Sequence, residues 1–215
     1  MGAKTWLLAY VENDSASEVL KSKPKPNRSE AVTLAKQLFP KERLQAIDDV
    51  TLLETSPPDN EIYIGCFPAL QIVCASEFAI DNPSKLPKSF INAGRGHKIY
   101  LHAMHSSVDW FAYAVWKDHK LERSLSLAPD TGIIEDLGSR LSFEEPYWSG
   151  AYPAIDPDED DDDYPFPFHP LELGEAALHA FFGFQLEGPI ESSLFDPEDI
   201  RLMAFKRLKP WWKIW

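Results

Sequence analysis

Residues 98–127 read K-I-Y-L-H-A-M-H-S-S-V-D-W-F-A-Y-A-V-W-K-D-H-K-L-E-R-S-L-S-L, and much of this run alternates with the period of a β-strand. Within residues 108–116 the alternation puts Val, Ala and Trp side chains on one face and Phe, Tyr and Val on the other, so both faces are apolar. A strand that is apolar on both faces must be covered on both faces. We therefore expect this segment to lie inside a sheet and not at its edge.

Two further strands flank this central one. Ser106 and Ser107 separate it from residues 99–105, and the polar residues 117–120 have the length of a short hairpin loop. In residues 121–127, Leu and Arg positions alternate with Glu and Ser positions, which predicts a half-exposed strand. The simplest arrangement of the three strands is a meander.

The rest of the chain predicts more strands than helices. Amphipathic periodicity indicates one helix that begins at Asn27 or Ser29 and is ended by Pro40, and a second helix over residues 171–184. We expect strands at residues 4–11, 44–47, 51–55, 61–67, 70–75 and 203–208, extended chain at 141–148, and short helical segments at 17–20, 82–93 and 133–137. Because strands and helices do not alternate regularly, we predict an α+β fold with a largely antiparallel central sheet, two main helices packed on it and a long acidic loop rich in proline and aromatic residues.

Composition indicates a folded chain with a local excess of negative charge. The 215 residues are 44% apolar and 13% aromatic, which suits a single domain over residues 1–208 that includes the acidic loop (149–170), followed by a Trp- and Lys-rich tail at 209–215. The formal charge is −13, and seven of the acidic residues lie in residues 156–163. Affinity for phosphates comes chiefly from Lys and Arg, so we expect no nucleic-acid partner.

The apolar runs and the cysteines of the sequence indicate in which cellular compartment the protein is located. No apolar run approaches the length of a membrane span, and the first residues lack the pattern of a signal peptide. Cys66 and Cys74 are flanked by apolar residues, which favours two buried thiols in a reducing compartment, although a hairpin that turned near Leu70 would allow a bridge between them. We predict a cytoplasmic protein without a transmembrane span; the oligomeric state is left open.

Six motifs are distributed over nearly the whole chain. They are M-G-A-K-T (1–5), Y-I-G-C-F-P (63–68), Y-L-H-A-M-H-S (100–106), D-W-F-A-Y-A-V-W (109–116), F-E-E-P-Y-W (143–148) and Y-P-F-P-F-H-P-L-E-L-G-E-A-A-L (164–178). With these motifs the chain resembles a family of uncharacterised bacterial cytosolic proteins, a domain of unknown function. The resemblance extends to about residue 207 and implies no activity.

His102, His105 and Asp109 are the first candidates for chemistry, as metal ligands or catalytic groups. The odd spacing of the two histidines places them on opposite faces of one strand, so a shared metal ion would require a turn at residues 106–107. Such a site could be completed by Glu144, Glu145 or His169. The favoured interpretation is hydrogen-bonded polar residues at strand ends around a tight turn, because H-x-x-H alone has little specificity.

Glu144 and Glu145 are candidates for a catalytic pair of carboxylates. Adjacent residues on an extended strand face apart, so they cannot flank one bond. We expect one of them to pair with a basic group and the other to face solvent.

The acidic run and the aromatic residues that follow it form the third candidate. The run, with Asp158, Asp160 and Asp162, is interpreted as a solvated loop, a calcium site or a contact for a basic partner. The rings that follow it alternate with prolines, which indicates either a preformed surface for a partner or a strap packed over the sheet; they belong to Tyr164, Phe166 and Phe168.

The main hypothesis is a non-catalytic binding or interaction protein that contacts a protein partner, for example a basic one, through the acidic and aromatic loop. No nucleotide-binding, hydrolase or zinc-protease motif occurs in the chain. The alternative is a metal-dependent hydrolase centred on His102, His105 and Asp109. No cofactor is predicted apart from the divalent metal of that alternative. Residues 209–215 would either contact an anionic surface or partner, or fold back on the core.

Overall fold

The structure is a computed structural model that describes residues 2–12, 15–94, 98–154, 164–187 and 194–208. Its strands are β1 (Lys4–Val11), β2 (Leu44–Ala46), β3 (Val50–Thr51), β4 (Glu61–Phe67), β5 (Leu70–Cys74), β6 (Lys98–His105), β7 (Trp110–Lys117), β8 (Lys120–Ala128), β9 (Gly132–Gly138) and β10 (Arg201–Arg207). Its α-helices are α1 (Ala16–Lys21), α2 (Arg28–Leu38), α3 (Lys88–Ile91), α4 (Glu145–Trp148) and α5 (Pro170–Phe182), with 3₁₀ turns η1 (Ser76–Phe78), η2 (Pro83–Lys85), η3 (Ser106–Val108) and η4 (Pro197–Asp199). The α+β prediction is confirmed.

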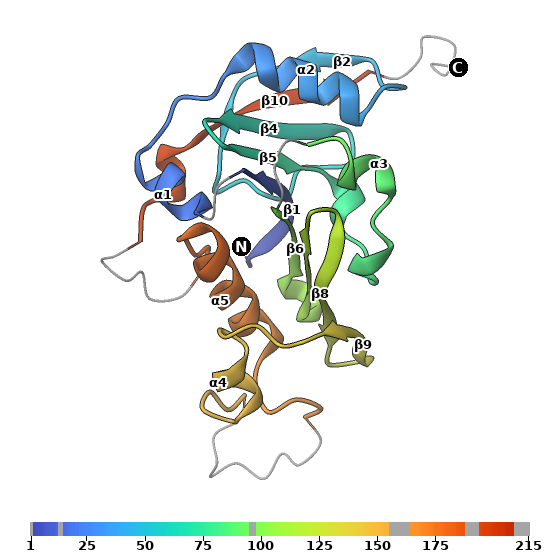
Figure 1. The fold of residues 1–215 in the computed structure, drawn as a ribbon, viewed down its shortest axis with the longest axis vertical. Coiled ribbons are helices and arrows are strands. Elements are labelled where there is room, and N and C mark those ends of the chain that lie inside the picture. The colour runs from blue at the N-terminus through green and yellow to red at the C-terminus, as the bar shows by residue number, and fades with distance from the viewer. Residues whose placement is uncertain (1, 13–14, 95–97, 155–163, 188–193, 209–215) are drawn as a thin grey trace.

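All ten strands belong to one sheet with the order β2-β10-β4-β5-β1-β6-β7-β8-β9, and β3 pairs with β10 (Figure 1). Every pairing is antiparallel. The first strand in the sequence, β1, lies between β5 and β6 near the middle of the sheet. Three long connections therefore cross strands of the sheet: from β1 to β2, which carries α1 and α2, from β5 to β6, and from β9 to β10.

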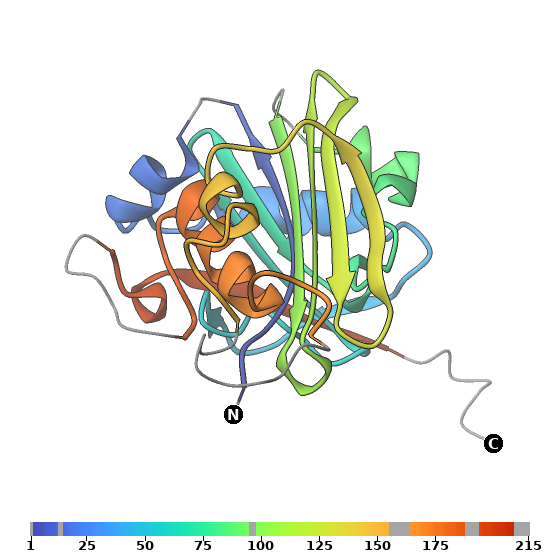
Figure 2. The ribbon, with the colours of Figure 1, turned by 90° about the horizontal axis from the view of Figure 1, so that it is seen from below.

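These connections cover opposite faces of the sheet (Figure 2). On the α5 face, helix α5 and the aromatic residues before it pack on side chains such as Leu7, Met104 and Phe111. On the α2 face, α2 and the segment from η1 to α3 pack on side chains such as Leu8 and Trp116. A sheet covered on both faces explains why its central strands are apolar on both sides.

Strand β7 confirms the expectation for the central segment. It pairs with β6 on one side and β8 on the other, and its residues from Trp110 to Trp116 are buried. Val108 is an exception, because it belongs to η3 and is 53% exposed. Asp109 has a left-handed backbone (φ 49°), which separates η3 from the strand.

The half-exposed pattern predicted for residues 121–127 is wrong. In β8 the polar side chains of Arg123, Ser124 and Ser126 are buried. They stay buried because each has a partner: Arg123 pairs with Glu144, Ser124 contacts Glu135 of β9, and Ser126 accepts a hydrogen bond from Trp110 Nε1 at 3.2 Å. Buried polar groups that are hydrogen-bonded cannot be recognised from alternation alone.

Residues 133–137 and 145–148 also differ from expectation. The first segment is not a helical turn but lies in strand β9, the edge strand paired with β8, and Gly132 (φ 75°) turns the chain back to make that pairing. The second segment is not extended but forms the one-turn helix α4, with Pro146 in its first turn, where proline is tolerated. Residues 82–93 hold η2 and α3 in place of one helix.

The strand expected at residues 51–55 is wrong as well, because β3 ends at Thr51 and residues 52–55 lie outside any strand. The following features agree with the sequence-based expectation. Asn27 is the N-cap of α2, and its side chain accepts a hydrogen bond from the backbone N–H of Glu30 at 3.2 Å. Cys66 and Cys74 are free and buried on opposite faces of the sheet, and burial raises the pKa of Cys66 to about 12, so that thiol stays protonated. Among the described residues, no helix combines the length and the apolar character that a membrane span requires.

Candidate functional site

His102 and His105 lie on opposite faces of β6, as their spacing predicts. The His102 imidazole is fully buried under α5, with Nδ1 2.7 Å from Thr5 Oγ1 and Nε2 3.0 Å from the carbonyl oxygen of Gly174. Because a carbonyl oxygen only accepts, Nε2–H donates to Gly174 and Nδ1 accepts from the Thr5 hydroxyl. Burial lowers the pKa of His102 to about 4, so this neutral ring is a hydrogen-bonded core residue.

His105 lies beside Trp6 on the other face, with ring centroids 5.8 Å apart. Partial burial and the nearby Lys4 lower its pKa. Asp109 approaches neither histidine of β6 but His169, with 3.8 Å between Oδ1 and Nε2. The residues proposed for a shared metal site are thus divided between two faces, and the described part of the chain holds no group of three or more His, Cys, Asp or Glu placed for a metal ion.

Glu144 and Glu145 behave as expected of neighbours that face apart. Glu144 is fully buried; its Oε2 lies 2.7 Å from Arg123 Nη2, and its Oε1 accepts from Tyr113 and from the backbone N–H of Leu141 at 2.5 and 2.7 Å. Arg123 also pairs with Asp136. Glu145 is exposed. Glu144 therefore fixes the loop before α4 to the sheet, and the two carboxylates do not form a catalytic pair.

The aromatic residues after the acidic run pack onto the α5 face. Phe166 and Phe168 are buried there, and the Tyr164 ring is half-buried and stacks on His169 at 6.3 Å between centroids. The two phenylalanines are thus core residues and not an exposed contact surface, because their rings fill the space between the sheet and α4. The acidic residues Asp158, Asp160 and Asp162 lie outside the described residues.

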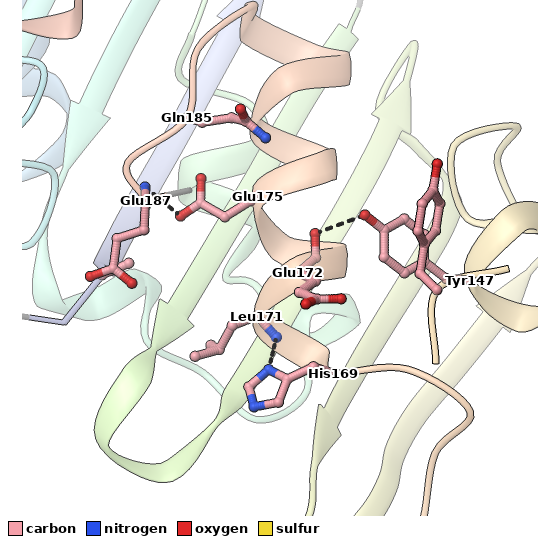
Figure 3. Close-up of a pocket in the computed structure, with 9 residues that line it drawn as sticks. Tyr147, His169, Leu171, Glu172, Glu175, Gln185 and Glu187 are labelled. Atoms are coloured by element: carbon pink, nitrogen blue, oxygen red, sulfur yellow. Dashed lines mark hydrogen bonds between the residues drawn. The ribbon is translucent and has the colours of Figure 1, made fainter. Parts of the chain in front are cut away.

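A pocket of about 550 Å³ opens beside the first turns of α5. Figure 3 shows that its side chains come from α5, from the α4 region and from the segment that follows α5. The lining residues are Ala3, Tyr147, Tyr152, His169, Leu171, Glu172, Glu175, Gln185 and Glu187. We call this cavity the glutamate pocket. Its size is within the usual range for sites of small ligands or single side chains.

Glu175 is the buried acid of the glutamate pocket, with 9% of its surface exposed. Gly183 ends α5 in a left-handed conformation (φ 77°), and the chain then returns beside the helix. As a result, the backbone N–H groups of Leu186 and Glu187 donate to the Glu175 carboxylate at 2.8 and 3.2 Å. Figure 3 shows the bond from Glu187. Burial raises the pKa of Glu175 to about 7; the charge of Glu187 adds to the rise, and the two hydrogen bonds oppose it.

The other polar groups of the pocket are held in place by the backbone. The His169 imidazole caps α5, because its Nδ1 accepts from the N–H of Leu171 at 3.3 Å. Tyr147 donates its hydroxyl to the carbonyl oxygen of Glu172 at 3.2 Å (Figure 3), and its ring lies 4.8 Å from that of Tyr152. Two phenol rings thus border the carboxylates.

The glutamate pocket favours positive charge. Among its described lining residues, three are carboxylic acids and none is Lys or Arg. Carboxylates beside aromatic rings attract ammonium and guanidinium groups through Coulomb and cation–π interactions. The sequence reasoning did not identify this site. The spacing of Glu172 and Glu175 on one helix face was visible, but the approach of Glu187 and Tyr147 depends on tertiary structure.

Comparison with known proteins gives one match. A family model described as "Family of unknown function (DUF6928)" matches residues 5–205. No curated protein and no solved structure matches the chain.

Proposed function

The chain belongs to the DUF6928 family of unknown function, and we propose that it is a binding protein that receives a positively charged group of its partner in the glutamate pocket. The observation that carries this proposal is the composition of the pocket: Glu172, Glu175 and Glu187 lie beside two tyrosines, and the described lining residues include no Lys or Arg. An ammonium or guanidinium group is the chemical complement of such a lining.

The position of the acidic run supports a basic partner. Residues 155–163 connect a segment whose Tyr152 lines the pocket to a segment whose Tyr164 stacks on His169, another lining residue. The described residues that flank the run on each side therefore lie at the glutamate pocket or beside one of its lining residues. We propose that Asp158, Asp160 and Asp162 add long-range attraction for the same partner, which raises the association rate more than it raises the affinity.

Binding, not catalysis, is the activity that this lining supports best. Glu172 and Glu187 are exposed, and the buried Glu175 has both carboxylate oxygens engaged by backbone N–H groups. Such a set can hold a cation, and it lacks a nucleophile paired with a base, which nucleophilic catalysis needs. We propose that the protein acts without a catalytic step and in the cytoplasm.

Calorimetric titration with a lysine-rich peptide tests the proposal. We expect saturable binding at low ionic strength that weakens as salt is added. The double variant Glu172→Gln/Glu187→Gln removes two charges from exposed pocket residues, and we expect about tenfold weaker binding from it, equivalent to about 1.4 kcal/mol.

The matched control is Glu42→Gln/Glu122→Gln, which changes the net charge equally at exposed positions that do not line the pocket. This control should bind within about twofold of the wild type, as expected for screened distant charges. Deletion of residues 158–163 should slow association and leave most of the affinity. Equal weakening by both double variants would show that the peptide responds only to overall charge, and the pocket proposal would then be wrong.

A further inference from the structure

A second pocket lies on the α2 face, opposite the glutamate pocket, at one end of the sheet. Its volume is about 490 Å³, and three of its lining residues are aromatic and come from three adjacent strands: Trp6 of β1, His105 of β6 and Trp110 of β7. The Trp6 ring centre is 5.8 Å from that of His105 and 6.0 Å from that of Trp110. We call this cavity the indole pocket.

The aromatic floor of the indole pocket is preformed. Trp110 is 8% exposed, and its indole Nε1–H donates to Ser126 at 3.2 Å. The backbone of Trp6 is held from the other side of β1, since its N–H donates to Thr55 and its carbonyl oxygen accepts from Ala75 at 2.9 and 3.1 Å. A ligand that binds here therefore does not have to order the rings first.

The charges at the indole pocket favour a cation. Asp81 and Asp130 line it and are exposed, and no Lys or Arg occurs among the lining residues in the described part of the chain. The neighbouring Lys4 already places its ammonium 5.8 Å from the Trp6 ring centre, which indicates that this ring accepts positive charge. Anions would be repelled by the two carboxylates.

The apolar part of the lining selects among cations. Besides the rings, the pocket presents aliphatic side chains such as Val108, which is 53% exposed, and Ile134. A strongly hydrated ion would lose its water against these groups, whereas a methylated ammonium has an apolar surface around its charge. We propose that the indole pocket binds a small molecule that carries a methylated ammonium group, with Trp6 and Trp110 as its aromatic walls and Asp81 and Asp130 as counter-charges.

Choline and its neutral isostere 3,3-dimethylbutan-1-ol test the proposal, because they have nearly the same shape and differ in charge. NMR spectra of the indole N–H groups of the full chain would be recorded, with the signals of Trp6 and Trp110 assigned from single Trp→Phe variants. We expect choline to shift these two signals saturably and the neutral alcohol to bind at least about fivefold more weakly. Equal binding of the two, or no shift with choline, would overturn the proposal.

Two variants sharpen the test without disturbing the core. Asp130→Asn changes an exposed rim residue and should weaken choline binding about threefold, as expected for a partly screened charge. Lys4→Met removes the competing internal cation and should strengthen choline binding by a similar factor. If Asp130→Asn bound choline with unchanged affinity, Asp130 would not act as a counter-charge to the ligand. The Glu172→Gln/Glu187→Gln variant should bind choline like the wild type, so this inference can fail or hold independently of the proposed function.

Discussion

Two buried glutamates of the same chain have opposite environments. Glu144, at the junction of β8 and the α4 loop, lies 2.7 Å from a guanidinium nitrogen of Arg123, and Tyr113 and a backbone N–H also donate to it. Glu175, in the glutamate pocket, accepts from two backbone N–H groups among the described residues and faces the charge of Glu187. The first acid is neutralised within the fold, whereas the described residues around the second include no Lys or Arg in the pocket lining. Glu144 therefore stabilises the structure, and the environment of Glu175 is the one that the proposed binding of a positively charged group requires.

The largest effect is expected at the neutralised glutamate. Arg123→Met leaves Glu144 buried without its cation, and we expect the free energy of unfolding to fall by about 3–5 kcal/mol. Urea denaturation measures this loss. The matched control is Arg28→Met, since Arg28 pairs with Asp49 at 2.5 Å on the surface, and it should cost less than about 1 kcal/mol. A similar loss from both variants would contradict the distinction between a buried and an exposed pair.

The next effect concerns the pH dependence of stability at Glu175. Its pKa in the folded chain, about 7, is above the ordinary value of 4.5, so the folded state binds more protons between these values. Its contribution to stability is therefore complete below pH 4.5 and is lost as the pH rises to 7, with a slope of up to about 1.4 kcal/mol per pH unit. Glu175→Gln should remove this contribution, and the loss of the slope is seen most directly between pH 6.5 and 7 in urea denaturation at a series of pH values. A profile that Glu175→Gln leaves unchanged would mean that the pKa of Glu175 is not raised in the folded chain.

His102 produces a slope of opposite sign. Its pKa in the folded chain, about 4, is below the ordinary 6.5, so the unfolded state binds more protons between these values and stability is lost as the pH falls from 6.5 to 4. In the wild type the two slopes offset each other where they overlap. His102→Gln should expose the Glu175 slope, and Glu175→Gln should expose the His102 slope. If His102→Gln and Glu175→Gln showed the same dependence of stability on pH, the two slopes could not be assigned to these two residues.

The sheet was largely predictable from sequence because its central strands have strong patterns. Residues 108–116 are apolar on both faces, and the periodicity of α2 and α5 fixes their positions to within a few residues. The errors occur where tertiary partners override the local pattern. Arg123 can be buried because it forms ion pairs with Glu144 and Asp136. Residues 133–137 form a strand because they pair with β8.

The candidate site was less predictable than the fold. The odd spacing of His102 and His105 correctly separated them. One glutamate of the pair Glu144 and Glu145 does bind a basic group while the other is exposed, but the segment is helical and not the extended strand from which this was argued. Glu175, however, has no sequence signature, because its pKa depends on burial and on a chain reversal at Gly183. The single domain and the contacts of the acidic run remain predictions.

The most direct measurement is the affinity for a lysine-rich peptide between pH 6 and pH 8, in the wild type and in Glu175→Gln. A cation in the glutamate pocket favours the ionised form of Glu175, so wild-type affinity should rise as the pH passes about 7. The variant keeps the other titratable groups of the pocket, His169 among them, and should show a smaller rise. The same pH dependence in both proteins, or none in the wild type, would contradict the conclusion that Glu175 receives the partner's charge.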